Sequence, residues 1–301
     1  MITRVTSQTQ MRDAQRNLQT NMANLAKLQE QASSLKAISR ASDNPTAAAS
    51  AMAVRTEQSA VAQYGRNADN GNNWLTTIDG ALDTASSLMN RVRDLTVQGA
   101  NDGSLSTAAK EAIAVELEGL KEELLSVANT KYLGRTVFAG NSDAGAAFTF
   151  EDGAYAFQGT ENSAVTRRIG ADNTVRVDAD GAAVFGSDAA NGTGSVFALI
   201  DTIAGELRSG TNVGSNLTAL DLRMTAMTEQ RSVGGARQAN LERAQEGLMT
   251  KAGALESTRA GLEDLDLGQA ILDLTLQETT YQAALAVTAR VLQPTLMDFL
   301  R

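Results

Sequence analysis

The sequence predicts a mainly α-helical, elongated protein that carries a small β-rich insert, and three observations lead to this fold class. Apolar residues make up 43% of the 301-residue chain but aromatic residues only 4%, so a thick aromatic core is not expected. Both ends of the chain carry apolar residues at heptad spacing, which is typical of long paired helices. Between residues 135 and 195, glycines, threonines and aromatic residues replace this spacing.

The first predicted helix spans most of residues 5–40. Its larger or apolar residues recur every three or four positions, at Met11, Ala14, Leu18, Met22, Leu25, Leu28, Ala32 and Leu35. The helix should end near Asp43, because a residue that precedes proline disfavours the helical conformation, whereas Pro45 suits the first turn of a new helix.

Two more helices are expected before the insert. The first runs from Pro45 toward Gln98, and its helical pattern is interrupted by the glycine and asparagines of residues 71–73. The next runs from Thr107 to Asn129, and Ser106 is its expected N-cap.

The insert shows the alternation that predicts β-hairpins. Aromatic residues alternate with small or polar ones on either side of a tight turn at Asp152–Gly153, namely Phe148, Phe150, Tyr155 and Phe157. Further strands are expected over residues 165–169 and 174–177, and Asp180–Gly181 is expected to form a turn rather than part of a calcium loop.

Helix is expected to resume near Val196. A seven-residue spacing then runs through Leu220, Met227, Gly234, Leu241, Leu248, Leu255 and Leu262. A second register follows through Leu267, Ile271, Leu274, Glu278, Tyr281, Leu285, Thr288, Leu292 and Phe299. We expect Asp264 and Asp266 to cap or solvate the start of this last helix.

The matched lengths of the terminal helices predict an antiparallel pair, and the pair suggests a division into domains. Residues 1–42 and 264–301 are expected to form a coiled coil, residues 43–134 and 196–263 a helical rod, and residues 135–195 the β-rich insert. Two helices are too thin to bury all of their apolar surface, so part of it should remain for neighbouring copies.

Several classes of function are disfavoured by composition. Cysteine and histidine are absent, which removes disulfides, thiol nucleophiles, histidine bases and the usual zinc ligands. The net charge of −9 opposes binding to nucleic acid and to anionic membranes. The N-terminus lacks the apolar region of a signal peptide, and no stretch of about 18 apolar residues predicts a membrane span.

Catalytic chemistry is not expected either. The chain has no nucleophile elbow, no phosphate-binding loop and no dinucleotide fingerprint. An acidic run is interpreted as a solvated helix face, because no pocket would separate the pKa values of its members, Glu116, Glu118, Glu122 and Glu123. We therefore predict no catalytic residue, no cofactor and no metal.

Four segments, in order, resemble the flagellin family. They are SSLKAISRASDNPTAAASAM from Ser33, GRNADNGNNWLTTIDGAL from Gly65, SVGGARQANLERA from Ser232, and DLDLGQAILDLTLQETTYQAALAVTARVLQPTLMDFLR from Asp264. Within this family, YLGRTVFAGN from Tyr132 resembles the hook-filament junction proteins more than flagellin itself. The chain departs from the family pattern at Leu35, where glycine is common, and at Arg40 and Ala41.

The resemblance implies a structural subunit of the bacterial flagellum that joins the hook to the filament. It implies an inner tube of terminal helices, a surrounding rod layer and a solvent-facing insert. It also implies a location outside the cell, export without a cleaved signal peptide by the flagellar type III apparatus, and escort by a cytosolic chaperone. The implied neighbours are further copies of the chain, the other hook-associated junction protein and flagellin.

Assembly is predicted to depend on eight apolar residues of the terminal helices: Leu18, Leu25, Leu28, Ile271, Leu274, Leu285, Leu292 and Phe299. Three alternatives remain open. The chain could be flagellin itself, a secreted helical hydrolase, for which acidic pairs are the only candidate residues, or a secretion-system tip protein, which would normally carry an apolar membrane-active segment.

Overall fold

The computed structural model describes residues 7–101, 105–151, 153–160, 163–188 and 194–292. Contacts divide the chain into two compact units. Unit 1 contains residues 1–60 and 251–301, and unit 2 contains residues 61–250. The boundaries fall inside two long helices, α2 (Pro45–Ala100) and α6 (Leu217–Glu263), so each helix contributes to both units. The predicted division into coiled coil, rod and insert follows other boundaries and stays a prediction.

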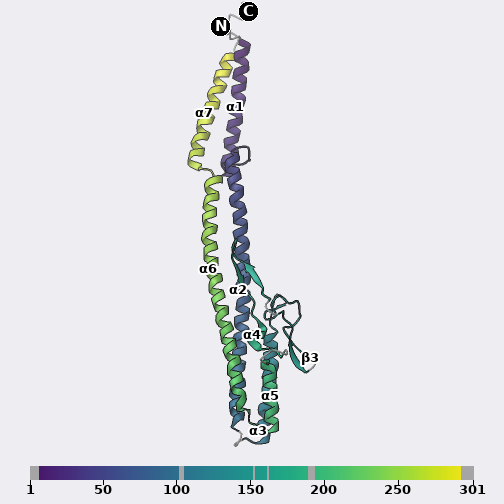
Figure 1. The fold of residues 1–301 in the computed structure, drawn as a ribbon. Helices are drawn as coiled ribbons and strands as arrows, with labels where there is room; N and C mark the ends of the chain where they lie inside the picture. Colours follow the sequence, from purple (N-terminus) through teal and green to yellow (C-terminus); the bar gives the residue numbers. More distant parts are fainter. Residues whose placement is uncertain (1–6, 102–104, 152, 161–162, 189–193, 293–301) are drawn as a thin grey trace, which may run out of the picture. The chain divides into compact units, whose positions relative to one another are not determined.

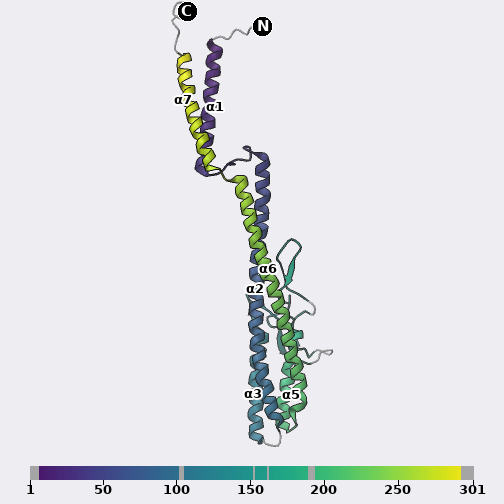
Figure 2. The same ribbon diagram turned by 90° about the vertical axis from the view of Figure 1, so that its left-hand side faces the viewer.

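Unit 1 is built around the first and last helices, α1 (Ser7–Ser34) and α7 (Leu267–Leu292), which lie side by side and antiparallel (Figures 1 and 2). The predicted pairing of the terminal helices is thus confirmed. The first helix ends earlier than expected, at Ser34, because Leu35 has a φ of 55° and leaves the helical conformation. Asn44 caps α2 as its side chain accepts a hydrogen bond from the Ala47 amide at 3.1 Å.

Unit 2 places α2 against the neighbouring helices without the interruption predicted at residues 71–73. Gly71 is buried, and a Cβ atom there would lie 3.1 Å from Val177 and 3.3 Å from Leu241. Gly71 therefore allows Val177 and Leu241 to pack closely against α2, and it does not end the helix. The heptad of α6 turns inward in this unit, since Leu220, Met227 and Leu241 are fully buried.

The remaining helices of unit 2 are α3 (Thr107–Ala128), α4 (Gly181–Phe185) and α5 (Val196–Ser209), followed by the 3-10 helix η2 (Val213–Asn216). Ser106 caps α3 as predicted, accepting a hydrogen bond from the Ala109 amide at 3.2 Å. The expected turn at Asp180–Gly181 is wrong. Asp180 instead caps α4 by accepting hydrogen bonds from the amides of Ala182 and Ala183.

Among the described residues, three two-stranded antiparallel ribbons form the β-rich part: β1 (Lys131–Tyr132) with β2 (Arg135–Thr136), β3 (Phe148–Glu151) with β4 (Ala154–Phe157), and β5 (Thr166–Arg168) with β6 (Thr174–Arg176). The predicted hairpin pairs Phe148 with Phe157 and Phe150 with Tyr155. Aromatic rings gather where this hairpin meets α4 and α5, at Phe138, Phe148, Tyr155, Phe185 and Phe197. The mainly helical fold with a small β-rich insert is therefore as predicted, although its aromatic residues concentrate in one local core.

Candidate assembly surfaces

The paired helices of unit 1 meet along a seam with alternating three- and four-residue spacing. On α1, the half-buried residues at this spacing are Ala14, Leu18, Asn21, Leu25, Leu28 and Ala32. On α7, the corresponding residues are Ala270, which is buried, and the half-buried Leu274, Gln277, Tyr281, Ala284 and Thr288. The Gln277 side chain donates a hydrogen bond to the Asn21 carbonyl at 3.1 Å, so one polar contact crosses the seam.

The predicted assembly residues fall into three groups. Leu18, Leu25, Leu28 and Leu274 lie half-buried along the seam. Ile271 and Leu285 are 58% and 42% exposed on the flank of α7. Leu292 is the last residue of α7, and Phe299 lies outside the described residues.

Half of the seam positions on α7 agree with the predicted pattern, and the other half differ from it by one residue. The sequence pattern ran through Ile271, Glu278 and Leu285, whereas the structure places Ala270, Gln277 and Ala284 against α1. The small side chains of the two alanines let the helices approach closely. A pattern based on large apolar residues does not include these alanines. The side chains of Ile271 and Leu285 are therefore not fully buried by contacts within the chain.

A second flank of α7 was missed by sequence reasoning. Leu272, Leu276 and Val287 are 67%, 68% and 59% exposed in the free chain. Each such side chain would contribute about 1.5–3 kcal/mol if a partner buried it fully. The signal is present in the sequence as apolar residues four and eleven positions apart, but these residues do not follow the heptad spacing of the seam.

The two breaks in the helices of unit 1 meet at a site that we call the elbow, formed by residues 35–44 and 264–266. The Leu265 amide donates to the Leu35 carbonyl at 3.1 Å, and the Ala37 amide donates to the Glu263 carbonyl at 2.8 Å. Asp266 caps α7 as expected, accepting hydrogen bonds from the amides of Gly268 and Gln269. Backbone hydrogen bonds in the elbow therefore hold the end of α1 close to the start of α7.

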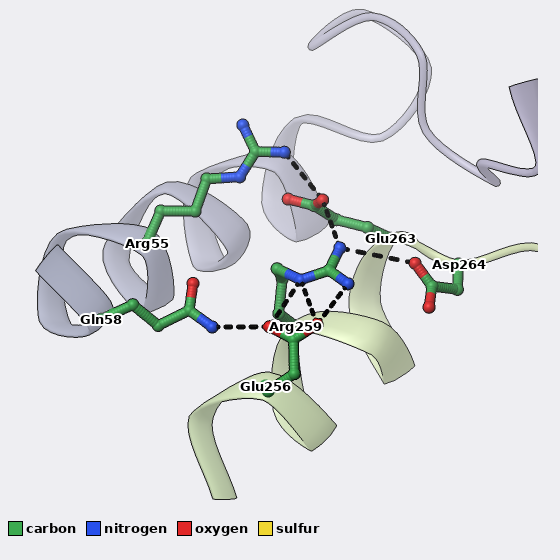
Figure 3. Close-up of polar contacts among 6 residues, drawn as sticks. All are labelled: Arg55, Gln58, Glu256, Arg259, Glu263 and Asp264. Atoms are coloured by element: carbon green, nitrogen blue, oxygen red, sulfur yellow. Dashed lines mark hydrogen bonds and ion pairs between the residues drawn. The ribbon is translucent and has the colours of Figure 1, made fainter. Parts of the chain in front are cut away.

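A charged cluster braces the elbow (Figure 3). The Glu263 side chain is only 5% exposed and lies 2.7 Å from Arg55 and 3.2 Å from Arg259. Arg259 also contacts Glu256 at 2.7 Å, and Glu256 accepts a hydrogen bond from Gln58 at 2.9 Å. Arg55, followed by Arg259, lowers the pKa of Glu263 although burial acts in the opposite direction.

Beside this cluster lies an open pocket of about 280 Å³ in unit 1. Its apolar lining includes Ile38, Ala51 and Met52, and its charged lining consists of Lys36, Arg40, Arg55 and Glu263. Sequence reasoning missed this pocket, because its residues come from the elbow, from α2 and from the end of α6.

Two of the four glutamates in the acidic run of α3 form ion pairs. Glu116 lies 2.5 Å from Arg91, and Glu118 lies 2.5 Å from Arg208. Over the described part of the chain, no group of three or more potential metal-ligating side chains is found. Across the same residues, no helix is both long and apolar enough to span a membrane.

Comparison with known proteins matches both helical ends of the chain. Residues 5–143 match the bacterial flagellin N-terminal helical region, and residues 217–300 match the bacterial flagellin C-terminal helical region.

Relatives and solved structures agree with these matches. A flagellin from Halalkalibacterium halodurans is 25% identical, with 93% of each chain covered. Flagellar hook-associated protein 3 from Salmonella typhimurium is 26% identical, with 74% of this chain and 73% of that protein covered. The crystal structure of FlgL from Xanthomonas campestris is similar in fold, with a TM-score of 0.62, 20% identity, and 69% and 99% of the two chains covered. Together with the paired terminal helices, these matches show that the chain belongs to the flagellin family of structural flagellar proteins.

Proposed function

We propose that this protein forms the layer that joins the flagellar hook to the filament. In this role copies of the chain assemble with one another, contact the other hook-associated junction protein on one side and contact flagellin on the other. The subunit adapts one helical lattice to the next and has no catalytic step. Its place is outside the cell, after export by the type III apparatus with the help of a cytosolic chaperone.

The observation that carries the proposal is the apolar surface left beside the α1–α7 seam. Ile271 and Leu285 are exposed on one flank of α7, and Leu272, Leu276 and Val287 on the other. This apolar surface stays exposed to water in a lone subunit and does not stabilise it, whereas neighbouring copies would bury it on both sides. The eight predicted assembly residues would thus divide between stabilising the pair and contacting neighbours.

A filament subunit is the second candidate, and the flagellin relative that covers 93% of each chain favours it. The segment from Tyr132 supports the junction instead, because its sequence resembles the junction proteins. It forms the β1–β2 turn, in which Leu133 is 78% exposed.

Immunogold electron microscopy of intact cells tests the choice, with an antibody against the region between Phe148 and Phe185. The junction role requires label only at the boundary between hook and filament. Label along the whole filament would make the protein a filament subunit, and absence of flagellar label would contradict both roles.

The assembly surface is tested separately with Leu285→Asp and Leu292→Asp, each made in the full chain. A charge at either position should reduce the number of attached filaments, because a charged group would have to leave water when neighbours dock. Unchanged filament attachment in both variants would contradict a role for these leucines.

A further inference from the structure

The pocket beside the elbow has the chemistry of a receptor for a carboxylate on an apolar stem. Ile38, Ala51 and Met52 give it apolar walls, and three cationic side chains, Lys36, Arg40 and Arg55, line it. Its single acid, Glu263, is already engaged by Arg55 and Arg259.

Two of the three cations are available to a ligand. The Arg40 side chain is 73% exposed, and its ion pair with Glu30 is long at 3.7 Å. Lys36 is exposed, and its ammonium group forms no ion pair with any residue that the structure describes. A carboxylate entering the pocket would therefore meet free positive charge without displacing the Glu263 cluster.

The distribution of charge indicates where such a carboxylate resides. Acidic and basic residues are equal in number in unit 1, so the whole net charge of −9 belongs to unit 2. Opposite potentials on two surfaces favour their encounter. A second copy of the chain thus carries an excess of the charge that the elbow pocket attracts.

Within unit 2, α3 offers the best-matched acids. Glu122 and Glu123 are adjacent and exposed, and neither carboxylate forms an ion pair with a described residue. The neighbouring Lys121 cannot neutralise them, because it lies 2.6 Å from Asp201. The exposed acids Glu242 and Glu246 on α6, by contrast, are four residues apart, with the basic Arg243 between them in sequence.

We propose that the elbow pocket of one copy binds the Glu122–Glu123 edge of α3 in a second copy. The two methylenes of a glutamate side chain lie against Ile38, Ala51 and Met52, and its carboxylate accepts hydrogen bonds from Lys36 and Arg40. This inference rests on the proposed function, because it takes the neighbouring subunit as the occupant.

The absence of cysteine from the chain allows a direct test by disulfide crosslinking. Cells produce Lys36→Cys and Glu122→Cys full-length chains together, and their isolated flagella are treated with a mild oxidant. We expect a reducible dimer of this 31.6 kDa chain that is several-fold more abundant than in the control, which combines Lys36→Cys with Glu246→Cys. Both glutamates are exposed on helices, so the control matches chemistry and accessibility.

Equal amounts of dimer in the two combinations would overturn the inference. A crosslink between the Lys36→Cys chain and a different flagellar protein would overturn it as well. The comparison is made on flagella in which the immunogold label is present at its expected boundary. A missing crosslink there rejects the docking pocket and leaves the junction role standing. Missing label rejects the junction role itself.

A charge-reversal experiment checks the electrostatic part. Lys36→Glu with Arg40→Glu should reduce filament attachment, and adding Glu122→Lys with Glu123→Lys to the same chain should restore much of it. Circular dichroism of each purified variant confirms that helix content is retained. Failure of the combined variant to recover attachment, although folded, would contradict the pairing of these charges.

Discussion

At the scale of single residues, two leucines adopt the left-handed backbone conformation that favours glycine. Leu35 has a φ of 55° and Leu133 a φ of 49°, and both are exposed. For a residue with a side chain this conformation costs about 1–2 kcal/mol. At Leu35 the cost is met because its carbonyl is fixed by the Leu265 amide across the elbow.

Replacing Leu35 with glycine should therefore stabilise unit 1. Relief of the left-handed strain exceeds the extra entropy that glycine loses on folding, so the free energy of unfolding should rise by about 0.5–1 kcal/mol. Urea denaturation followed by circular dichroism measures the change. Leu35→Ala is the matched control, since alanine keeps the strain; an equal gain in both variants would contradict the explanation.

The charged cluster at the elbow makes a prediction about pH. Because the pKa of Glu263 is lowered in the folded chain, its charge stabilises the fold above the ordinary glutamate pKa of about 4.3. This stabilisation is lost as the pH falls through the lowered folded-state pKa. Glu263→Gln should lower the free energy of unfolding by about 1–2 kcal/mol near neutral pH, since charged hydrogen bonds are replaced by weaker ones.

The measurement is the difference in unfolding free energy between Glu263→Gln and the unmodified chain as a function of pH. The difference should shrink as the pH falls below about 4, because the Glu263 carboxyl becomes protonated and loses its charge. A difference that stays constant over this range would show that packing, rather than charge, sets the role of Glu263. Glu57→Gln, at an exposed pair with Lys251, is the control and should change stability little.

At the scale of elements, replacing glycine with leucine should have opposite effects at two positions of α2. Gly71 faces Val177 and Leu241 at short distance, whereas a side chain at Gly80 would meet nothing within 4 Å. Gly71→Leu should destabilise the chain by about 1–3 kcal/mol through overpacking. Gly80→Leu should stabilise it by up to about 0.8 kcal/mol through helix propensity. Thermal unfolding compares them, and a destabilised Gly80→Leu variant would contradict this assignment.

The terminal helix α7 offers a matched pair for separating folding from assembly. Leu274 lies half-buried in the seam, and Leu272 is 67% exposed on the same helix. Leu274→Ala should lower the free energy of unfolding of the isolated chain by about 1–2 kcal/mol, because it removes buried apolar area. Leu272→Ala should leave that value nearly unchanged and reduce filament attachment. Equal loss of stability in both variants would contradict the observed register.

The same elements show how far the sequence predicts the structure. Heptad spacing identified both terminal helices, and the alternation around Phe148 and Tyr155 identified the hairpin, because each signal is local. The pairing of the terminal helices followed from their matched lengths. Half of the seam positions on α7 were not predicted, because alanine and glutamine give a weaker apolar signal than the neighbouring Ile271 and Leu285. The sequence around Gly71 predicts a local interruption, but a glycine is needed there because Val177 and Leu241, which are far away in sequence, pack closely against it.

At the scale of the whole molecule, the candidate site could be predicted only in part. Four of the eight predicted assembly residues lie in the seam and two on its flank, so the sequence located the right helices. The elbow pocket could not be predicted, because its basic residues lie in the elbow and on α2, whereas its acid, Glu263, lies far along the chain. Family membership, in contrast, followed from motifs that are continuous in sequence.

The antiparallel pairing of the first helix with the last has a consequence for the order in which the chain folds. Residues 61–250 can make their own contacts as they emerge, but α1 has no partner until α7 has been synthesised. Contacts between such distant segments form late, since the intervening loop must close first. The first segment made is therefore among the last to be ordered, and a chain that stops short of α7 would leave α1 without its partner helix.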